Sequence, residues 1–332
     1  MTEKCIAKAE GSLSPPYFFA GEICVDPDSN NSAEEGTGCG ISLVNDGLNR
    51  GVQISFLNIM ERNMTGVQAS FWTNAAKDMT GFQLAGWSNW SLGEMLGLQI
   101  AMRGNTAEKS MVGAQLAGAW NYSSKDMKGI QFGGVNKSDG KTMAGQFGVV
   151  NWSKRGLIGV QLGATNLSDA AMLGIQAGAV NWSHQDMTGI QVAGLVNSSD
   201  QDMIGIQASL LANMAFFGMT GAQVSLIANT ADKGMQGVQA AGLVNGASVF
   251  MKGLQVALVN YLDLGDMTGL QVGALNMAPK GNMKGVKVGV VNIAGGEMPG
   301  AFGIVNLSGR CKKGIATPIW GGMCVFGRID GK

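Results

Sequence analysis

The stretch Met187-Thr-Gly-Ile-Gln-Val-Ala-Gly-Leu-Val-Asn197 recurs in close copies along almost the whole chain. Fourteen intact Gly-x-Gln copies, fifteen or sixteen residues apart except for one thirty-residue gap, begin at Gly51, Gly66, Gly81, Gly97, Gly113, Gly129, Gly159, Gly174, Gly189, Gly205, Gly221, Gly237, Gly253 and Gly269. The gap holds a degenerate copy at Gly145-Gln146, and further variants begin at Gly38, Gly285 and Gly300. Because self-similarity at a fixed period is typical of solenoids, propellers and arrays, this repeat decides the fold.

Each unit has two parts of different composition. After the repeat Gly, aliphatic residues such as Ile190 and Val192 occupy the first and third places, while Gln191 and a small residue, Ala193, occupy the second and fourth. Alternation with a period of two predicts a strand. The part from Asn to Met collects charges and turn formers, as in residues 198–202, which predicts a solvated turn.

Strands with the same residue in the same place can stack so that like residues lie over each other at about 4.8 Å. Gln over Gln and Asn over Asn would then form ladders of hydrogen-bonded side-chain amides. A Met stands two residues before most of the repeat glycines, and we expect these Met residues, together with the first- and third-place aliphatics, to fill the interior. The Asn follows the Gly by seven residues in some blocks of neighbouring units and by eight in others, as stacked coils require.

These patterns predict an all-β fold, a β-solenoid of about eighteen coils of 15–16 residues over residues 38–309. Residues 1–37 do not repeat and would be an N-terminal cap or leader, and residues 310–332 would be a C-terminal cap. The alternative is an up-and-down β-barrel of outer-membrane type. The block-wise variation of the units, the lack of long loops and the lack of a visible export signal weigh against the barrel.

Composition excludes one class of partner. The chain has 23 basic and 23 acidic residues, charged residues are 14% of the total, and no long Lys/Arg run occurs, so we expect no nucleic-acid binding. No apolar run reaches the ~18 residues of a membrane-spanning helix. The first ten residues lack the long apolar core of a secretory signal.

The five cysteines, Cys5, Cys24, Cys39, Cys311 and Cys324, all lie near the two ends of the chain. Disulfides that staple the caps and reduced, buried thiols both fit this placement. Because five is an odd number and connectivity cannot be derived from sequence, both possibilities stay open.

No catalytic, cofactor-binding or metal-ligating residue is predicted. His184 is the only histidine and lies in a turn segment, so one chain cannot assemble a His-based triad or a multi-His metal site. Asp26, Asp28 and Asn30 are spaced as in a calcium loop, but that segment lacks the loop's turn Gly and its bidentate Glu, which indicates an ordinary polar loop. The Met column could suggest soft-metal ligation, but core filling is the better interpretation.

Three sets of turn residues have two interpretations each. The first set would form a solvated charged edge or bind cations weakly: Asp78, Asp126, Asp186, Asp202 and Asp266. The second satisfies the N-glycosylation pattern, although a ladder Asn followed by a turn-forming Ser explains it more simply: Asn89, Asn121, Asn151 and Asn181. The third would pack into a neighbouring turn, or form a strip for a partner or glycan: Trp90, Tyr122, Trp152, Trp182 and Tyr261.

The units that end at Asn197, Asn245 and Asn260, such as Gly-Ile-Gln-Val-Ala-Gly-Leu-Val-Asn197, resemble bacterial surface-repeat proteins with tandem Gly-x-Gln-x-Gly-Leu-Val-Asn units. The resemblance covers roughly residues 38–309. It implies a bacterial origin and a non-enzymatic role at the cell surface or in a secreted particle, and it carries no functional residues across. The N-terminus, without a visible signal peptide, departs from that picture of localisation.

The sequence therefore predicts a non-enzymatic structural or interaction protein, a rigid repeat-built surface or scaffold of a bacterial cell or secreted particle. Its partner would be a protein, a cell-surface component or further copies of itself. The alternative is an outer-membrane-type channel, which follows only from the barrel interpretation and is the one case with a membrane partner.

Overall fold

The computed structural model describes residues 37–45, 50–60 and 62–309, and every described element is a strand. The chain divides into two compact units, residues 1–143 and 144–332. Most of the two predicted caps lies outside the described residues, with Asp26, Asp28, Asn30 and four of the five cysteines. The part of the chain that the structure describes contains no helix long and apolar enough to cross a membrane.

In unit 1 the strands are β1 (Thr37–Asn45), β2 (Arg50–Ile59), β3 (Met64–Ala76), β4 (Met79–Ala85), β5 (Ser88–Ser91), β6 (Met95–Ala101), β7 (Gly104–Ala107), β8 (Met111–Ala117), β9 (Trp120–Ser123) and β10 (Met127–Ser138). The division between the units falls within β11 (Thr142–Ser153).

Unit 2 continues with β12 (Leu157–Ser168), β13 (Met172–Ser183), β14 (Met187–Ser199), β15 (Met203–Ser209), β16 (Ala212–Ala215), β17 (Gly218–Ser225), β18 (Ala228–Ala231), β19 (Gly234–Ala241) and β20 (Val244–Ala247). It ends with β21 (Met251–Val256), β22 (Val259–Leu262), β23 (Met267–Val272), β24 (Leu275–Ala278), β25 (Met283–Val288), β26 (Val291–Ala294), β27 (Gly300–Phe302) and β28 (Val305–Ser308).

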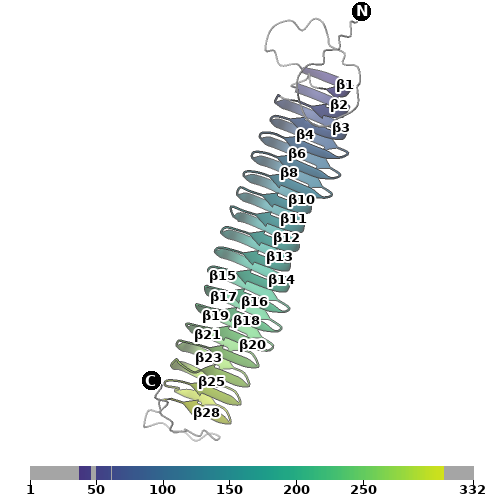
Figure 1. Cartoon of the computed structure of the whole chain (residues 1–332). Coiled ribbons are helices and arrows are strands. Elements are labelled where there is room, and N and C mark those ends of the chain that lie inside the picture. Colours follow the sequence, from purple (N-terminus) through teal and green to yellow (C-terminus); the bar gives the residue numbers. More distant parts are fainter. Residues whose placement is uncertain (1–36, 46–49, 61, 310–332) are drawn as a thin grey trace, which may run out of the picture. The chain divides into compact units, whose positions relative to one another are not determined.

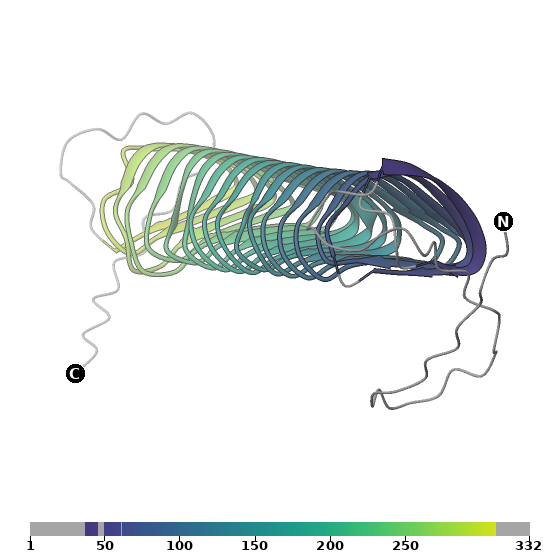
Figure 2. The same ribbon diagram turned by 90° about the horizontal axis from the view of Figure 1, so that it is seen from above.

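One sequence repeat makes one coil. Within each of the two compact units the coils stack one on the next (Figure 1). In most coils a long strand carries the Met, Gly and Gln places and a short strand carries the Asn; elsewhere one continuous strand carries all four. Seen from above, the coils of each unit follow one another as nested loops (Figure 2). The predicted β-solenoid is confirmed, with about 16 turns.

Like residues pair with like across the stack, as predicted. In β14 and β15, Met187 lies opposite Met203, Gly189 opposite Gly205 and Gln191 opposite Gln207. The pairing is parallel, whereas consecutive strands of an up-and-down barrel run antiparallel. The barrel alternative is therefore not the fold of this chain.

The interior differs from the prediction. Gln191 has no exposed surface, whereas the neighbouring Ile190 and Val192 are 37% and 45% exposed. The Met column is buried as expected, but the first- and third-place aliphatics point outward, and the prediction that they fill the core is wrong. The reason is the period of two, since Met187 and Gln191 are four residues apart and therefore share one face of the strand.

The repeat Gly is required by close backbone approach. Gly189 has a φ of 138°, and a Cβ added to it would lie 2.0 Å from the carbonyl oxygen of Gly174 in the preceding coil. Ala144 is the one non-glycine among the described residues with a positive φ, at 128°. Ala144 takes the Gly place of the degenerate copy, so that this repeat reads Ala-x-Gln. Gly145 is therefore the residue that follows the repeat-Gly place.

The block-wise spacing of Asn also has a structural counterpart. Asn181 follows its repeat Gly by seven residues and Asn197 follows its own by eight. The register between β13 and β14 shifts between Gly178 and Val180, where the extra residue is absorbed, and Asn181 then pairs with Asn197. The bulge lies where two blocks meet, because coils within one block need none.

Candidate functional site

The interior holds two ladders of side-chain amides. In unit 2 each Gln donates from Nε2 to Oε1 of the Gln one coil earlier: Gln191 to Gln176 at 2.7 Å and Gln207 to Gln191 at 2.7 Å. Each Asn donates from Nδ2 to Oδ1 of the Asn one coil later, as Asn197 does to Asn213 at 2.9 Å. Unit 1 has the same two directions, with Gln99 donating to Gln83 and Asn89 to Asn105. These groups are engaged with one another, so the ladders hold the coils together and present nothing to a ligand.

Lys287 stands where the Gln ladder of unit 2 ends. Its side chain is fully buried, and its Nζ donates to the backbone carbonyl of Ile293 at 2.5 Å. Gln271, one coil earlier, keeps an Oε1 without a hydrogen-bond partner. Burial disfavours the charged form and lowers the pKa of Lys287 from 10.5 to about 7.

The turn aspartates bond to backbone of the next coil. Asp78 accepts from the backbone N–H of Glu94 at 2.7 Å, and Asp202 accepts from that of Gly218 at 2.9 Å. The other three of the predicted set accept in the same way: Asp126 from Lys141, Asp186 from Asp202 and Asp266 from Asn282. The structure thus gives each of them a role in fastening adjacent turns, and no group of three metal-ligating side chains forms within the described residues.

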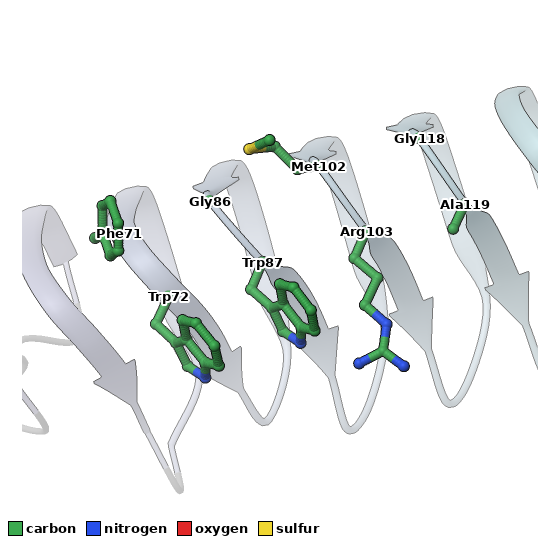
Figure 3. A pocket seen from close by; sticks show the side chains of 8 residues that line it. All are labelled: Phe71, Trp72, Gly86, Trp87, Met102, Arg103, Gly118 and Ala119. Carbon is green, nitrogen blue, oxygen red and sulfur yellow. The ribbon is translucent and has the colours of Figure 1, made fainter.

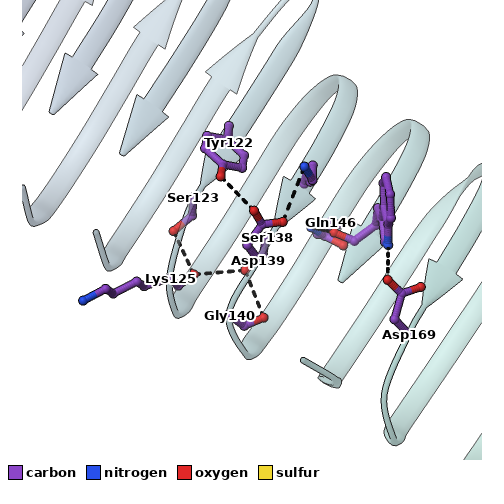
Figure 4. Close-up of polar contacts among 10 residues, drawn as sticks. Tyr122, Ser123, Lys125, Ser138, Asp139, Gly140, Gln146 and Asp169 are labelled. Atoms are coloured by element: carbon purple, nitrogen blue, oxygen red, sulfur yellow. Dashed lines mark hydrogen bonds and ion pairs between the residues drawn. The ribbon is translucent and has the colours of Figure 1, made fainter. Parts of the chain in front are cut away.

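Four of the five aromatic residues that follow the ladder Asn donate to turn carboxylates. In unit 1, Tyr122 donates from its hydroxyl to Asp139 at 2.8 Å, which raises the pKa of Tyr122 through burial and that hydrogen bond (Figure 4). Beside it, Ser138 donates to the carbonyl oxygens of Lys125 and Gly140 and closes the turn. For Tyr122 these contacts match the packed interpretation, whereas Trp90 and Trp182 of the same set are exposed.

In unit 2, Trp152 donates from its indole N–H to Asp169 at 2.9 Å, and Trp182 donates to Asp200 at 2.9 Å. His184 stacks on Trp182 with ring centroids 4.9 Å apart, and its Nδ1 lies 3.4 Å from an oxygen of Asp169. The remaining two residues of the set bond locally, Trp90 to Ser88 and Tyr261 to Asp263.

The four Asn residues of the glycosylation pattern are at most 1% exposed, and all are ladder members. Asn181, for example, donates to Asn197 at 2.9 Å and to the carbonyl of Val192 at 2.8 Å. A glycan on such a nitrogen would have to break the ladder, so the folded coils offer no acceptor at these positions.

A wide apolar surface covers the outside of the long strands in unit 2. We call it the apolar strand face and define it by the outward residues of β12 to β15: Ile158, Val160, Leu162, Leu173, Ile175, Ala177, Thr188, Ile190, Val192, Ile204, Ile206 and Ala208. Leu173 and Ile204 are 52% and 53% exposed. Contiguous exposed apolar patches on soluble proteins mark interaction sites, because leaving such a surface in water is unfavourable.

A second exposed surface follows one corner of unit 1, on the outside of successive coils between the Gln place and the Asn place. Trp72 and Trp87 stack with ring centroids 5.0 Å apart and planes 2° apart, and Phe56 lies 6.5 Å beyond Trp72 (Figure 3 draws the Trp pair). The guanidinium of Arg103 continues the stack, 4.7 Å from the Trp87 ring and 4.6 Å from the Trp120 ring.

A hollow of about 420 Å³ opens beside this stack. Phe71 and Met102 project on one side of it, while Trp72, Trp87 and Arg103 project together on the other (Figure 3). Its floor consists of small residues, Gly86, Gly118 and Ala119. Sequence reasoning missed this corner, although the signal was present: Trp72, Trp87 and Arg103 each stand two places before a ladder Asn in successive coils.

Comparison of the chain with protein-family models, curated proteins and solved structures gives no match. Two exposed surfaces remain as candidates for a partner, the apolar strand face of unit 2 and the aromatic corner of unit 1.

Proposed function

We propose that this protein is a non-enzymatic scaffold whose repeat-built surface associates with further copies of itself through the apolar strand face. The observation that carries the proposal is the outward orientation of the aliphatic columns, which places residues such as Ile190 and Ile206 in water rather than in the core. Burying that surface between two copies would recover roughly 25 cal/mol for each Å² of apolar area removed from water.

The period of the apolar strand face favours a second copy of this chain as the partner. Each aliphatic column repeats with the coil, so the face carries ridges and furrows at a spacing of about 4.8 Å. A second copy of the same chain has ridges at the same spacing, and its side chains can interdigitate over many coils as in stacked β-sheet assemblies. A partner without that period would match only a few of the ridges.

A bacterial origin and a location on the cell surface or in a secreted particle form part of the proposal. Their support is the resemblance of the tandem Gly-x-Gln units to bacterial surface-repeat proteins. The non-enzymatic role is supported by the engagement of the buried Gln and Asn side chains in ladders and of the turn aspartates in backbone contacts.

The test introduces charge where this chain already tolerates it. Lys128, Lys252 and Lys284 occupy the place before the repeat Gly in their own units, so the double variant Leu173→Lys and Ile204→Lys should fold. We expect wild-type chains to associate in analytical ultracentrifugation and this variant to shift toward the monomer. The matched control, Gln185→Lys and Gln201→Lys, adds the same charge in the turns and should associate as wild type. A monomeric wild type, or equal association of the strand-face variant, would contradict the proposal.

A further inference from the structure

Arg103 is held between two indole rings. Its guanidinium carbon lies 4.7 Å from the ring centroid of Trp87 and 4.6 Å from that of Trp120, so the cation contacts both rings. We call this arrangement the Arg103 clamp. Arg103 is itself exposed, and none of the described carboxylates forms an ion pair with it. The N–H donors along the edge of the guanidinium are therefore oriented and open to solvent.

The surrounding chain makes room for the clamp. Trp120 lies over Gly104, where an added Cβ would come within 2.3 Å of the indole carbon Cε2. The place of Gly104 in the preceding coil is taken by Ser88 and in the following coil by Trp120. Any side chain at residue 104 would push Trp120 away from Arg103. Stacking of this kind fixes the guanidinium before a ligand arrives, which lowers the entropy lost on binding.

Arg103 lines the hollow of about 420 Å³ together with mainly apolar side chains, among them Phe71 and Met102 (Figure 3). Gly86 and Gly118 line its floor, and close backbone approach requires both: a Cβ on Gly86 would lie 2.0 Å from the carbonyl oxygen of Phe71, and one on Gly118 would lie 2.3 Å from that of Met102. A ligand that fits here has an apolar group for the hollow and an anionic group for Arg103.

The geometry narrows the ligand class. A guanidinium edge matches a carboxylate with two parallel hydrogen bonds. The faces of Trp72 and Trp87 cover each other at 5.0 Å, so they are not free to stack on a sugar ring. An anionic bilayer is recognised by clusters of 4–8 Lys/Arg, whereas Arg103 is the one cation that lines the hollow. We propose that the Arg103 clamp and the adjoining hollow bind a peptide segment that places a carboxylate beside a bulky apolar side chain.

This site is in unit 1 and does not depend on the apolar strand face of unit 2, so self-association and peptide binding succeed or fail separately. The probe is the peptide acetyl-Gly-Leu-Phe with a free terminal carboxylate, titrated into the full chain and followed by tryptophan fluorescence and calorimetry. We expect saturable binding, and roughly tenfold or greater weakening when the same peptide carries a terminal amide, because the bidentate ionic hydrogen bonds are lost.

Three variants assign the binding to the clamp. Arg103→Gln should weaken binding of the free-acid peptide roughly tenfold or more and leave the affinity for the amide peptide unchanged. Arg103→Lys should restore only part of the lost affinity, because an ammonium lacks the planar arrangement of donors. Arg155→Gln removes an exposed turn arginine of unit 2 and should bind as wild type. Circular dichroism verifies the fold of each variant. The proposal is overturned by equal affinity for acid and amide, by unchanged binding in Arg103→Gln, or by binding only to phosphatidylglycerol vesicles.

Discussion

Gln191 donates its side-chain N–H to the side-chain carbonyl of Gln176, one coil earlier, at 2.7 Å. The Asn ladder runs in the opposite direction, since Asn181 donates to Asn197, one coil later, at 2.9 Å. The amide dipoles of the two ladders therefore oppose each other along the stack. Each ladder also has a defined polarity, so that a substitution acts differently according to whether it removes a donor or an acceptor.

Gln191→Glu should destabilise the fold strongly. A carboxylate can still accept from Gln207, but it cannot donate to Gln176, and it places a buried charge in a neutral column. The cost is about 1–3 kcal/mol for the unpaired acceptor alone, with more for the charge. Thermal unfolding measures the effect, with Gln201→Glu as the control, because Gln201 lies in a turn outside the ladder. Equally small effects from both variants would refute the ladder account.

Lys287→Gln should stabilise the last coils of unit 2. The amide can donate to Oε1 of Gln271, which has no partner, and it removes a buried amine. Amide hydrogen exchange in β23 to β26 would report the change as slower local opening. The control is Lys284→Gln, which removes an exposed lysine from the same strand. If Lys287→Gln opens faster than wild type, the amine is the better occupant of this place.

The stability of the same region should depend on pH through Lys287. Burial lowers its pKa to about 7 in the folded chain from 10.5. Between these values the unfolded chain binds more protons, so stability rises as pH increases from about 7 to about 10.5, by up to about 1.4 kcal/mol per pH unit. Below about 7 both states are protonated and the dependence ends. The difference between wild type and Lys287→Gln should therefore shrink with rising pH, and a constant difference would contradict the low pKa.

Ala144→Gly should stabilise unit 2. Ala144 has a φ of 128°, a conformation that Gly adopts freely and that places the Cβ of other residues under strain. Removal of the strain stabilises the folded state by more than the flexibility of Gly in the unfolded chain destabilises it. The free energy of unfolding should therefore rise by roughly 1 kcal/mol. The control is Ala179→Gly, at a position without a positive φ, which should lose roughly 0.5–1 kcal/mol. Chemical denaturation compares the two, and a loss in both would show that Ala144 is unstrained.

Asp202→Ala should cost roughly 0.5–1.5 kcal/mol, because Asp202 accepts the backbone N–H of Gly218 at 2.9 Å. Asp202→Asn keeps an acceptor oxygen, so its melting temperature should stay close to that of the wild type. Thermal unfolding with and without millimolar calcium completes the test, and we expect no shift from the ion. A clear rise in melting temperature with calcium, abolished by Asp202→Asn, would instead support the weak cation-binding interpretation of the turn aspartates.

Much of the fold could be read from the repeat. A fixed period of fifteen or sixteen residues and the same polar residue in the same place leave few arrangements in which every amide is paired. Stacking in register is one of them, which is why the Gln and Asn ladders were predictable. The bulge between Gly178 and Val180 was also predictable from sequence, because the spacing from the repeat Gly to the Asn changes between the repeat of β13 and that of β14.

The candidate sites were much less predictable. Trp72, Trp87 and Arg103 recur at coil spacing, but only the stacking distances show that the two rings cover each other and that the cation continues the column. Gly86 and Gly118 line the hollow beside them, and only the structure shows that each approaches a carbonyl oxygen of the preceding coil too closely for a side chain.

The sequence by itself determined the period, the strand-and-turn division of each unit and the register, because identical residues must lie over one another for the amides to pair. The tertiary structure decided which face of the strand is inside. Alternation defines two faces without choosing between them, and hydrophobicity alone places Ile190 and Val192 in the core. The coil instead buries the face that carries Met187 and Gln191. The side-chain amides on that face can form hydrogen bonds with the coils before and after. The aliphatic residues consequently lie on the outside, where they form the surface on which the proposed function rests.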